Sequence, residues 1–208
     1  ASAILQLEEQ GKLSVNDKLS KYFPNYPKGD SVTVHMLLNH TSGIKNFYQN
    51  SELFKNVSIS ETPKDSILNL IKKESFDFSP GTFWGYSNTG YILLGYIIEQ
   101  VSGQTYSEYV EKNLFQKAGM FNSGIFTQDA IIKKRAYGYS QTNNGLITQM
   151  VINFNVGYSH GGLYSTIADL FKWTKALYSN KIISNESLNK MHTPNREEGG
   201  AGYGIFID

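Results

Sequence analysis

Three polar side chains stand together at the point where a loop turns into a helix. Tyr86, Ser87 and Asn88 follow a Pro80-Gly81 turn and precede a strongly apolar segment. They place a phenol, a hydroxyl and an amide at a helix start, where backbone N–H groups favour developing negative charge and the helix fixes side-chain geometry. The pattern suits a catalytic site. An ordinary helix cap at Ser87 or Asn88 would give the same pattern, so the residues alone leave both interpretations open.

Ser87 also lies in a segment, Gly85 to Gly90, that is close to the Gly-x-Ser-x-Gly turn around the nucleophile of α/β-hydrolases. The spacing fails, because the second glycine of this segment comes one residue too late after Ser87. A buried apolar strand should precede such a turn, whereas the segment at 75–79 is short and polar. We therefore do not expect Ser87 to be a nucleophile.

Two Ser-x-x-Lys pairs, at 42–45 and 187–190, offer a second kind of serine nucleophile. On a helix the lysine lies one turn after the serine and can help to take its proton. Gly43 directly after Ser42 indicates a helix end, and Ser187 lies in a short polar segment. We therefore expect neither Ser42 nor Ser187 to be a nucleophile.

The histidines give no sign of a metal site. They lack the i, i+4 spacing of a helical zinc pair, and no carboxylate cluster accompanies them: His35, His40, His160 and His192. His40 is expected to be a hydrogen-bonded structural residue that supports the site. His160-Gly161-Gly162 could bring a backbone close to a ligand, although a glycine pair more often permits a tight turn. Because the chain has neither a phosphate loop nor Gly-x-Gly-x-x-Gly, we expect no cofactor.

Composition and charge exclude several classes of function. Lys and Arg number 19 against 18 Asp and Glu, and the net charge of +1 gives no field that would collect nucleic acid. Without cysteine the chain has no disulfide, no thiolate nucleophile and no cysteine-based metal site. Its mean hydropathy is -0.34, and its apolar runs fall far short of the roughly 20 residues that span a membrane. The cellular compartment stays open, because exported proteins can also lack cysteine.

Helices dominate the elements that must position these residues. Apolar periodicity and capping residues predict helices at 1–10, 33–39, 62–74, 88–101, 105–118, 165–178 and 185–191. Thr62 and Pro63 are expected as N-cap and first residue of their helix, and Thr105 with Glu108 as a capping box. Short strands are expected at 136–140 and 147–152, joined by a turn at 143–145.

The two ends of the sequence have an unusual character. Nothing before Ala1 could cap the first helix, and Tyr203 to Asp208 has the aromatic and β-branched character of a strand with no following neighbour. With no linker or repeat between them, residues 1–208 are expected to form one domain that is truncated at both ends. The C-terminal strand is expected to lack a partner and to offer an edge for self-association.

Together, four segments resemble the serine β-lactamase and penicillin-binding protein superfamily, in its branch similar to class C β-lactamases, D-alanyl-D-alanine carboxypeptidases and related esterases. They follow in family order: the stretch after the nucleophile at 4–17, Leu-Leu-x-His-Thr-Ser-Gly within 34–44, Pro-Gly with Tyr-x-Asn and a helix at 78–103, and Gly-Gly-Leu-x-Ser-Thr at 161–166 followed by Asp169-Leu170. The resemblance implies an α/β fold of the β-lactamase/transpeptidase type, an antiparallel sheet flanked by helices plus a helical subdomain. Most of that sheet would lie outside these residues.

The resemblance also implies what these residues lack. The family nucleophile, the serine of a Ser-x-x-Lys element, is expected a few residues before Ala1, and a Lys-Thr-Gly or His-x-Gly strand after Asp208. His160 imitates His-x-Gly but comes too soon after Tyr86, so it is not given this role. In the family's mechanism Tyr86 would shuttle protons and Asn88 would donate to the amide carbonyl of the substrate, with Ser87 and His40 in support. The 208 residues by themselves are expected to be inactive.

For the intact protein the resemblance implies a serine hydrolase that forms an acyl-enzyme with a β-lactam, a D-Ala-D-Ala peptide or an ester. A non-catalytic module that binds peptidoglycan fragments or a protein partner is the alternative, and a Ser-x-x-Lys upstream of Ala1 would discriminate the two. Family resemblance alone indicates a bacterial protein exported to the periplasm, the cell surface or the medium. A small molecule or peptide is the expected substrate.

Overall fold

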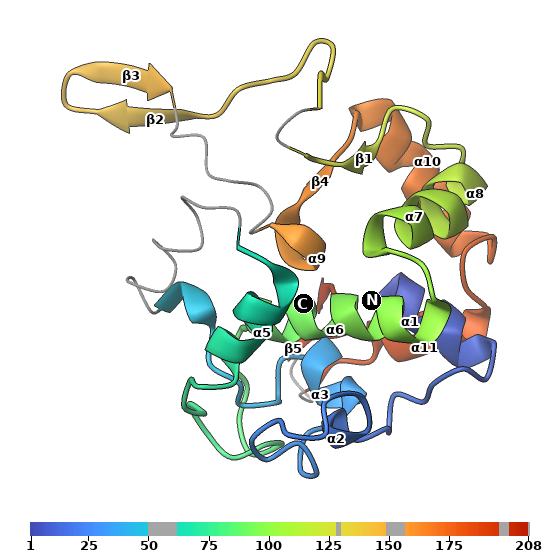
Figure 1. The fold of residues 1–208 in the computed structure, drawn as a ribbon. Helices are drawn as coiled ribbons and strands as arrows, with labels where there is room; N and C mark the ends of the chain where they lie inside the picture. The colour runs from blue at the N-terminus through green and yellow to red at the C-terminus, as the bar shows by residue number, and fades with distance from the viewer. Residues whose placement is uncertain (50–61, 128–129, 149–156, 196–199, 208) are drawn as a thin grey trace.

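One long apolar helix crosses the middle of the molecule, and several other helices pack against it (Figure 1). The structure, a computed structural model, describes residues 1–49, 62–127, 130–148, 157–195 and 200–207. Its helices are α1 Ser2–Glu9, α2 Leu19–Tyr22, α3 Val34–Leu38, η1 Phe47–Gln49, α5 Lys64–Ile71, α6 Asn88–Ser102, α7 Tyr106–Val110, η2 Glu111–Phe115, α8 Gln116–Ala118, α9 Tyr158–Gly161, α10 Ile167–Tyr178 and α11 Asn185–His192. Its strands are β1 Gly124–Ile125, β2 Tyr139–Thr142, β3 Gly145–Thr148, β4 Leu163–Tyr164, β5 Gly200–Ala201 and β6 Phe206–Ile207.

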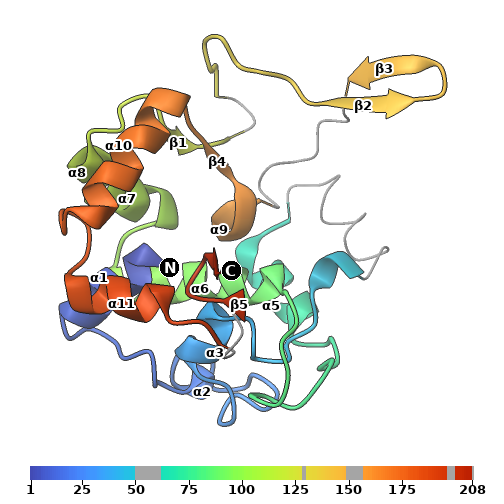
Figure 2. The ribbon, with the colours of Figure 1, turned by 180° about the vertical axis from the view of Figure 1, so that it is seen from behind.

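The strands of the described residues form three small antiparallel pairs. β1 pairs with β4, β2 with β3, and β5 with β6. In both views the β2–β3 hairpin extends away from the helices (Figure 2), and most of its residues are exposed. The described part of the chain is therefore mainly helical, as the sequence predicts.

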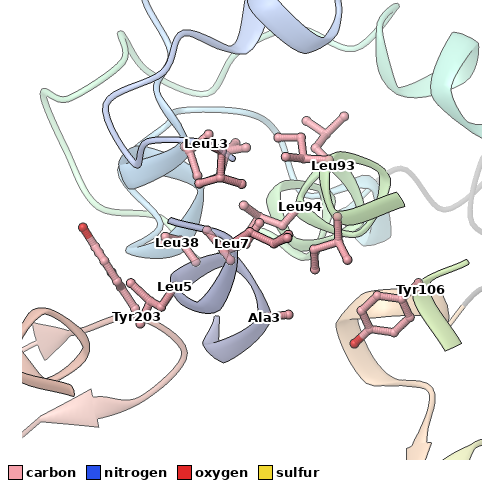
Figure 3. Close-up of a cluster of buried hydrophobic side chains, with 14 of the residues drawn as sticks. Ala3, Leu5, Leu7, Leu13, Leu38, Leu93, Leu94, Tyr106 and Tyr203 are labelled. Carbon is pink, nitrogen blue, oxygen red and sulfur yellow. The ribbon is translucent and has the colours of Figure 1, made fainter. Parts of the chain in front are cut away.

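Helix α6 forms the centre of the apolar core. Its side chains Leu93 and Leu94 are buried together with Leu5 and Leu7 of α1 and Leu38 of α3 (Figure 3). Burying a leucine side chain contributes about 1.5–3 kcal/mol, so the apolar face of α6 holds the surrounding helices in place. The N-terminal end of α6 carries Asn88, and this packing therefore fixes the position of that residue.

Several predicted elements are confirmed and others need correction. Helix α6 matches the predicted 88–101 to within one residue and ends at Gly103 in the left-handed conformation, with φ of 70°. The Thr105/Glu108 capping box is present, but the predicted helix 105–118 is interrupted by the π-helical turn η2. Pro63, predicted as the first helical residue, is the cap of α5 because its ψ of 146° is extended, and α5 ends at Ile71 rather than at residue 74.

The predicted strands are shifted along the chain. β2 and β3 are joined by the two residues Asn143 and Asn144, and Gly145 pairs with Thr142 inside the ladder instead of lying in the turn. The predicted strand residues 149–152 lie outside the described residues. At the C-terminal end, β6 pairs with the preceding β5, so the expected lack of a partner was wrong. A turn at Gly204, where φ is 73°, brings these two strands together.

A buried carboxylate joins α10 to the segment before β1. Asp169 is fully buried, and its oxygens accept hydrogen bonds from the backbone N–H of Asn122 at 2.7 Å and the hydroxyl of Ser123 at 3.0 Å. The ammonium of Lys172 lies 2.7 Å away. Hydrogen bonding to Lys172 lowers the pKa of Asp169, so the carboxylate is charged at neutral pH and every oxygen has a partner.

Replacing Asp169 by Asn should therefore destabilise the fold. Asp169→Asn removes the charge and leaves buried donors poorly paired, and we expect a loss of about 1–3 kcal/mol in the free energy of unfolding. The control is Glu186→Gln, because Glu186 is exposed and also pairs with a lysine. It should change the free energy by less than about 0.5 kcal/mol. Denaturant titration measures both, and equal effects would contradict a structural role for Asp169.

Candidate active site

Backbone hydrogen bonds tie the loop after α3 to the loop before α6. The carbonyls of His40, Thr41 and Gly43 accept from the N–H groups of Gly85, Gly81 and Asp77 at 3.0, 2.8 and 2.9 Å. At Gly43 φ is 71°, and a Cβ atom there would lie 2.2 Å from the carbonyl oxygen of Phe78. Only glycine permits this approach. The family-like Leu-Leu-x-His-Thr-Ser-Gly stretch thus fixes the loop that leads into Tyr86.

His40 connects the two loops through its side chain. Its Nδ1 accepts a hydrogen bond from the backbone N–H of Ser87 at 3.2 Å, and its ring lies 4.5 Å from that of Tyr86 and 5.1 Å from that of Tyr91. The side chain is buried, and burial lowers the pKa of His40 to about 4. His40 is therefore neutral at physiological pH, as its acceptor role at Nδ1 requires. This geometry fits the supporting role that the sequence predicts.

Ser87 and Thr89 fix the start of α6. The Ser87 hydroxyl accepts from the backbone N–H of Gly90 at 3.3 Å and is buried, so Ser87 is the N-cap of the helix. The Thr89 hydroxyl donates to the carbonyl of Lys45 at 2.8 Å and accepts from the N–H of Phe47 at 2.9 Å. One end of α6 is thereby tied to the segment that leads into η1.

Tyr86 and Asn88 flank Ser87 at this fixed helix start, with Tyr86 exposed and Asn88 half-buried. Tyr86 is 47% exposed, and its hydroxyl donates to Oδ1 of Asn88 at 3.3 Å. Nδ2 of Asn88 donates to Oδ1 of Asn46 at 3.4 Å. Both distances are long for hydrogen bonds, and the amide of Asn88 carries a second hydrogen. A phenol and an amide are thus held side by side, and both can form further hydrogen bonds to a substrate.

A cavity of about 220 Å³ opens beside Tyr86. Its described lining residues include neither a carboxylate nor a lysine or arginine: His40, Tyr86, Tyr91, His160, Ala201, Gly202, Gly204, Ile205 and Phe206. Burial lowers the pKa of His160, like that of His40, to about 4. The described walls of this cavity therefore have no charge at neutral pH.

The two serines of the Ser-x-x-Lys pairs lie away from this cavity. Ser42 and Ser187 are both buried, and neither is among the described residues that line it. The hydroxyl of Ser42 accepts from the N–H of Ile44 at 3.3 Å within its own turn. Ser187 lies in the first turn of α11, where its N–H donates to Ser184. The absence of a nucleophile at Ser42 and Ser187 stays a prediction.

The structure adds residues that the sequence did not indicate. Asn46 bonds to Asn88, and Tyr48 lies 2.8 Å from Nε2 of His160 through its hydroxyl. The sequence left the role of His160 undecided, because its partner is 112 positions away. Residues 46 and 48 follow directly after the family-like stretch at 34–44, which is the one signal that could have pointed to them. Within the described residues, no group of three His, Asp or Glu side chains is arranged to hold a metal.

Comparison with known proteins now identifies the family. A family model described as Beta-lactamase matches residues 1–207. The chain belongs to the beta-lactamase family. It is 35% identical to a putative penicillin-binding protein, PbpX, of Bacillus subtilis, over 100% of this chain and 50% of that protein. It is 26% identical to a teichoic acid D-alanine hydrolase of Staphylococcus aureus, over 89% of this chain and 45% of that protein.

A solved structure of a family member agrees with the predicted fold class. A penicillin-binding protein from Bacillus halodurans superposes with a TM-score of 0.85 at 36% identity, covering 100% of this chain and 66% of that one. The fold is therefore of the β-lactamase/transpeptidase type, as the sequence predicts. The chain spans about half the length of the curated relatives that it matches. No helix among the described residues is long and apolar enough to cross a membrane.

The neutral state of His40 predicts how stability depends on pH. The pKa of His40 falls from 6.5 to about 4 on folding, so the unfolded chain binds a proton at a higher pH than the folded one. The free energy of unfolding should decrease as the pH falls from about 6.5 to about 4, by up to about 3 kcal/mol for His40.

The His40→Phe variant tests this dependence. It should be less stable at pH 7, because the Ser87 N–H loses its acceptor, and it should lose less stability on acidification. Part of the pH dependence should remain, since burial also lowers the pKa values of His35 and His160. Denaturant titration between pH 4 and 7 measures the slope. A slope equal to that of the unmodified protein would contradict a buried, neutral His40.

Proposed function

We propose that the complete protein carrying this chain is a serine-type hydrolase that works through an acyl-enzyme. One observation carries the proposal: an outward-facing Tyr86 is held next to Asn88 on the rigid start of α6, beside a cavity. We propose that these two residues are the Tyr-x-Asn element that the sequence resemblance implies, and the Beta-lactamase match over residues 1–207 supports this assignment. Membership of that family and the penicillin-binding and D-alanine hydrolase names of the relatives support it.

The proposed reaction is acyl transfer in two steps. A serine outside the 208 residues attacks the carbonyl of a β-lactam, a D-alanyl-D-alanine peptide or an ester. The bond from this carbonyl to the leaving nitrogen or oxygen breaks as that atom takes up a proton; a peptide or ester leaving group departs, whereas the amine of an opened β-lactam ring stays attached to the acyl group. Water then attacks the acyl-enzyme, which releases the acid and restores the serine hydroxyl. We propose that the 208 residues by themselves do not perform this reaction.

Tyr86 is proposed to move the proton in both steps. A phenol acts in this way at neutral pH only if a nearby cation stabilises its anion or shares its proton. The described walls of the cavity offer no lysine or arginine, so we propose that the lysine of the Ser-x-x-Lys element supplies this charge. Ser87 and His40 are proposed to hold Tyr86 in position through the helix cap and the Ser87 N–H.

The names of the relatives also bear on location and partners. Penicillin-binding proteins and a teichoic acid D-alanine hydrolase are among the relatives, and we propose that this protein too is exported or held at the cell surface. A small molecule or a peptide is the proposed substrate. Self-association through the C-terminal strand stays a prediction, although β5 already occupies one edge of β6.

Removing the phenol hydroxyl should abolish most of the turnover. In the complete protein Tyr86→Phe should lower kcat/KM about 10²-fold or more, as expected for a lost general acid and base. Because Tyr86 is half exposed, the unfolding transition should not change. Tyr178→Phe is the control, since Tyr178 is also an exposed tyrosine but belongs to α10. Undiminished hydrolysis of an ester or β-lactam by Tyr86→Phe would contradict the proposed role of Tyr86 in proton transfer.

Asn88 should matter most for substrates that carry an amide. Asn88→Ala removes a donor to the amide carbonyl, and a simple ester has no such carbonyl to bind. We expect kcat/KM to fall about 10-fold more for an acylamino substrate than for a simple ester, as one well-placed hydrogen bond would give. Steady-state kinetics with the two substrates measure the difference. Equal losses of kcat/KM for the two substrates would show that Asn88 contributes only to the structure of the helix start and does not bind the amide carbonyl.

A further inference from the structure

A tyrosine and a histidine from distant parts of the chain meet at the edge of the active-site cavity. Tyr48 belongs to η1 and His160 to α9, and the Tyr48 hydroxyl lies 2.8 Å from Nε2 of His160. Their rings meet edge to face with centroids 5.5 Å apart, and the ring of Phe47 lies 5.7 Å from that of His160. His160 lines the same cavity as Tyr86. The family-like motifs give this pair no role.

Both members of the pair are fixed to helix α6. The N–H of Phe47 donates to the Thr89 hydroxyl at 2.9 Å, which holds η1 at the first turn of the helix. The hydroxyl of Ser159 donates to the carbonyl of Tyr91 at 2.7 Å, which holds α9 two residues further along the helix. The position of the pair relative to Tyr86 is therefore set by the same helix that carries Asn88.

Glycine at position 95 makes the second of these contacts possible. A Cβ atom at Gly95 would lie 2.2 Å from the hydroxyl oxygen of Ser159. Any larger residue would push α9, and with it His160, away from α6. Gly95 therefore permits the close approach of α6 and α9, although it lies far from Tyr48 and His160 in the sequence.

The pair is uncharged at neutral pH. Burial lowers the pKa of His160 to about 4, and burial together with the nearby Tyr86 raises that of Tyr48. The described walls of the adjoining cavity also lack charged side chains. A charged acyl group that packs against these walls would lose water without gaining a counter-charge from any described lining residue, which is costly, whereas an aromatic or aliphatic group would gain from burial.

We propose that Tyr48 and His160 together determine acyl-group specificity, by forming a wall that favours uncharged, preferably aromatic, acyl groups over anionic ones. The inference rests on the proposed function, in which Asn88 binds the acyl side of the substrate. Asn88 bonds to Asn46, two residues before Tyr48, so the wall lies on that side. His160 lines the cavity and would contact a bound group, whereas Tyr48, which is 37% exposed and not among the described lining residues, holds the His160 ring from beside the cavity.

Three esters with one leaving group test this specificity in the complete protein. The p-nitrophenyl esters of acetic, phenylacetic and succinic acid offer a small, an aromatic and an anionic acyl group. For the unmodified protein we expect kcat/KM for the phenylacetate to exceed that for the hemisuccinate by about 10-fold or more. This comparison needs no variant and is independent of any effect on folding.

Variants then assign the preference to the pair. Tyr48→Ala and His160→Ala should each lower kcat/KM about 10-fold for the phenylacetate and less than about 3-fold for the acetate. Tyr178→Ala is the matched control, because Tyr178 also binds a histidine, His192 at 2.9 Å, but on α10 and α11. The control should keep the selectivity, and thermal unfolding confirms that each variant is folded.

The outcomes separate this inference from the function on which it rests. No acylation of the complete protein by any ester, and no hydrolysis, would overturn the proposed function and this inference with it. Hydrolysis of all three esters without preference for the phenylacetate, or equal losses for all three in Tyr48→Ala, would overturn the specificity role alone. Retained selectivity in both Tyr48→Ala and His160→Ala would also overturn the specificity role alone.

Discussion

The pairing of two loops is the constraint on which the rest of the site depends. Three carbonyls at residues 40–43 accept N–H groups from residues 77–85, and Nδ1 of His40 accepts the N–H of Ser87. Because these bonds involve the backbone, they fix where the chain enters α6. The backbone positions of Tyr86 and Asn88 are then fixed, because the long apolar helix that follows is anchored in the core.

Local signals allowed the sequence to predict part of this arrangement. Ser87 before an apolar run, and Gly103 after it, mark the ends of α6 within one residue, because caps act over a single turn. The cluster at 86–88 is contiguous, so its chemistry was visible without a fold. Its roles came from the family resemblance, which the Beta-lactamase match over 1–207 supports.

Contacts between distant residues could not be predicted in the same way. Neither Asn46 nor Tyr48 has a type or spacing that indicates a partner on α6 or α9, since residue type alone does not report tertiary contacts. The shift of β3 has a local cause: the sequence predicts Gly145 in the turn, but Asn143 and Asn144 suffice for the turn. The position of Pro63 differs from the prediction by one residue, because proline tolerates both the cap and the first helical position.

Ser87 lies between Tyr86 and Asn88 and caps the helix that begins at Asn88. Its hydroxyl therefore contributes both to the stability of the fold and to the geometry of the site. A position with both duties has little freedom to vary during evolution, because a single substitution there changes abundance and chemistry together. Exposed side chains at the rim are not bound in this way. Proteins built on this helix start should therefore diverge in substrate preference at the rim first, and at the cap last.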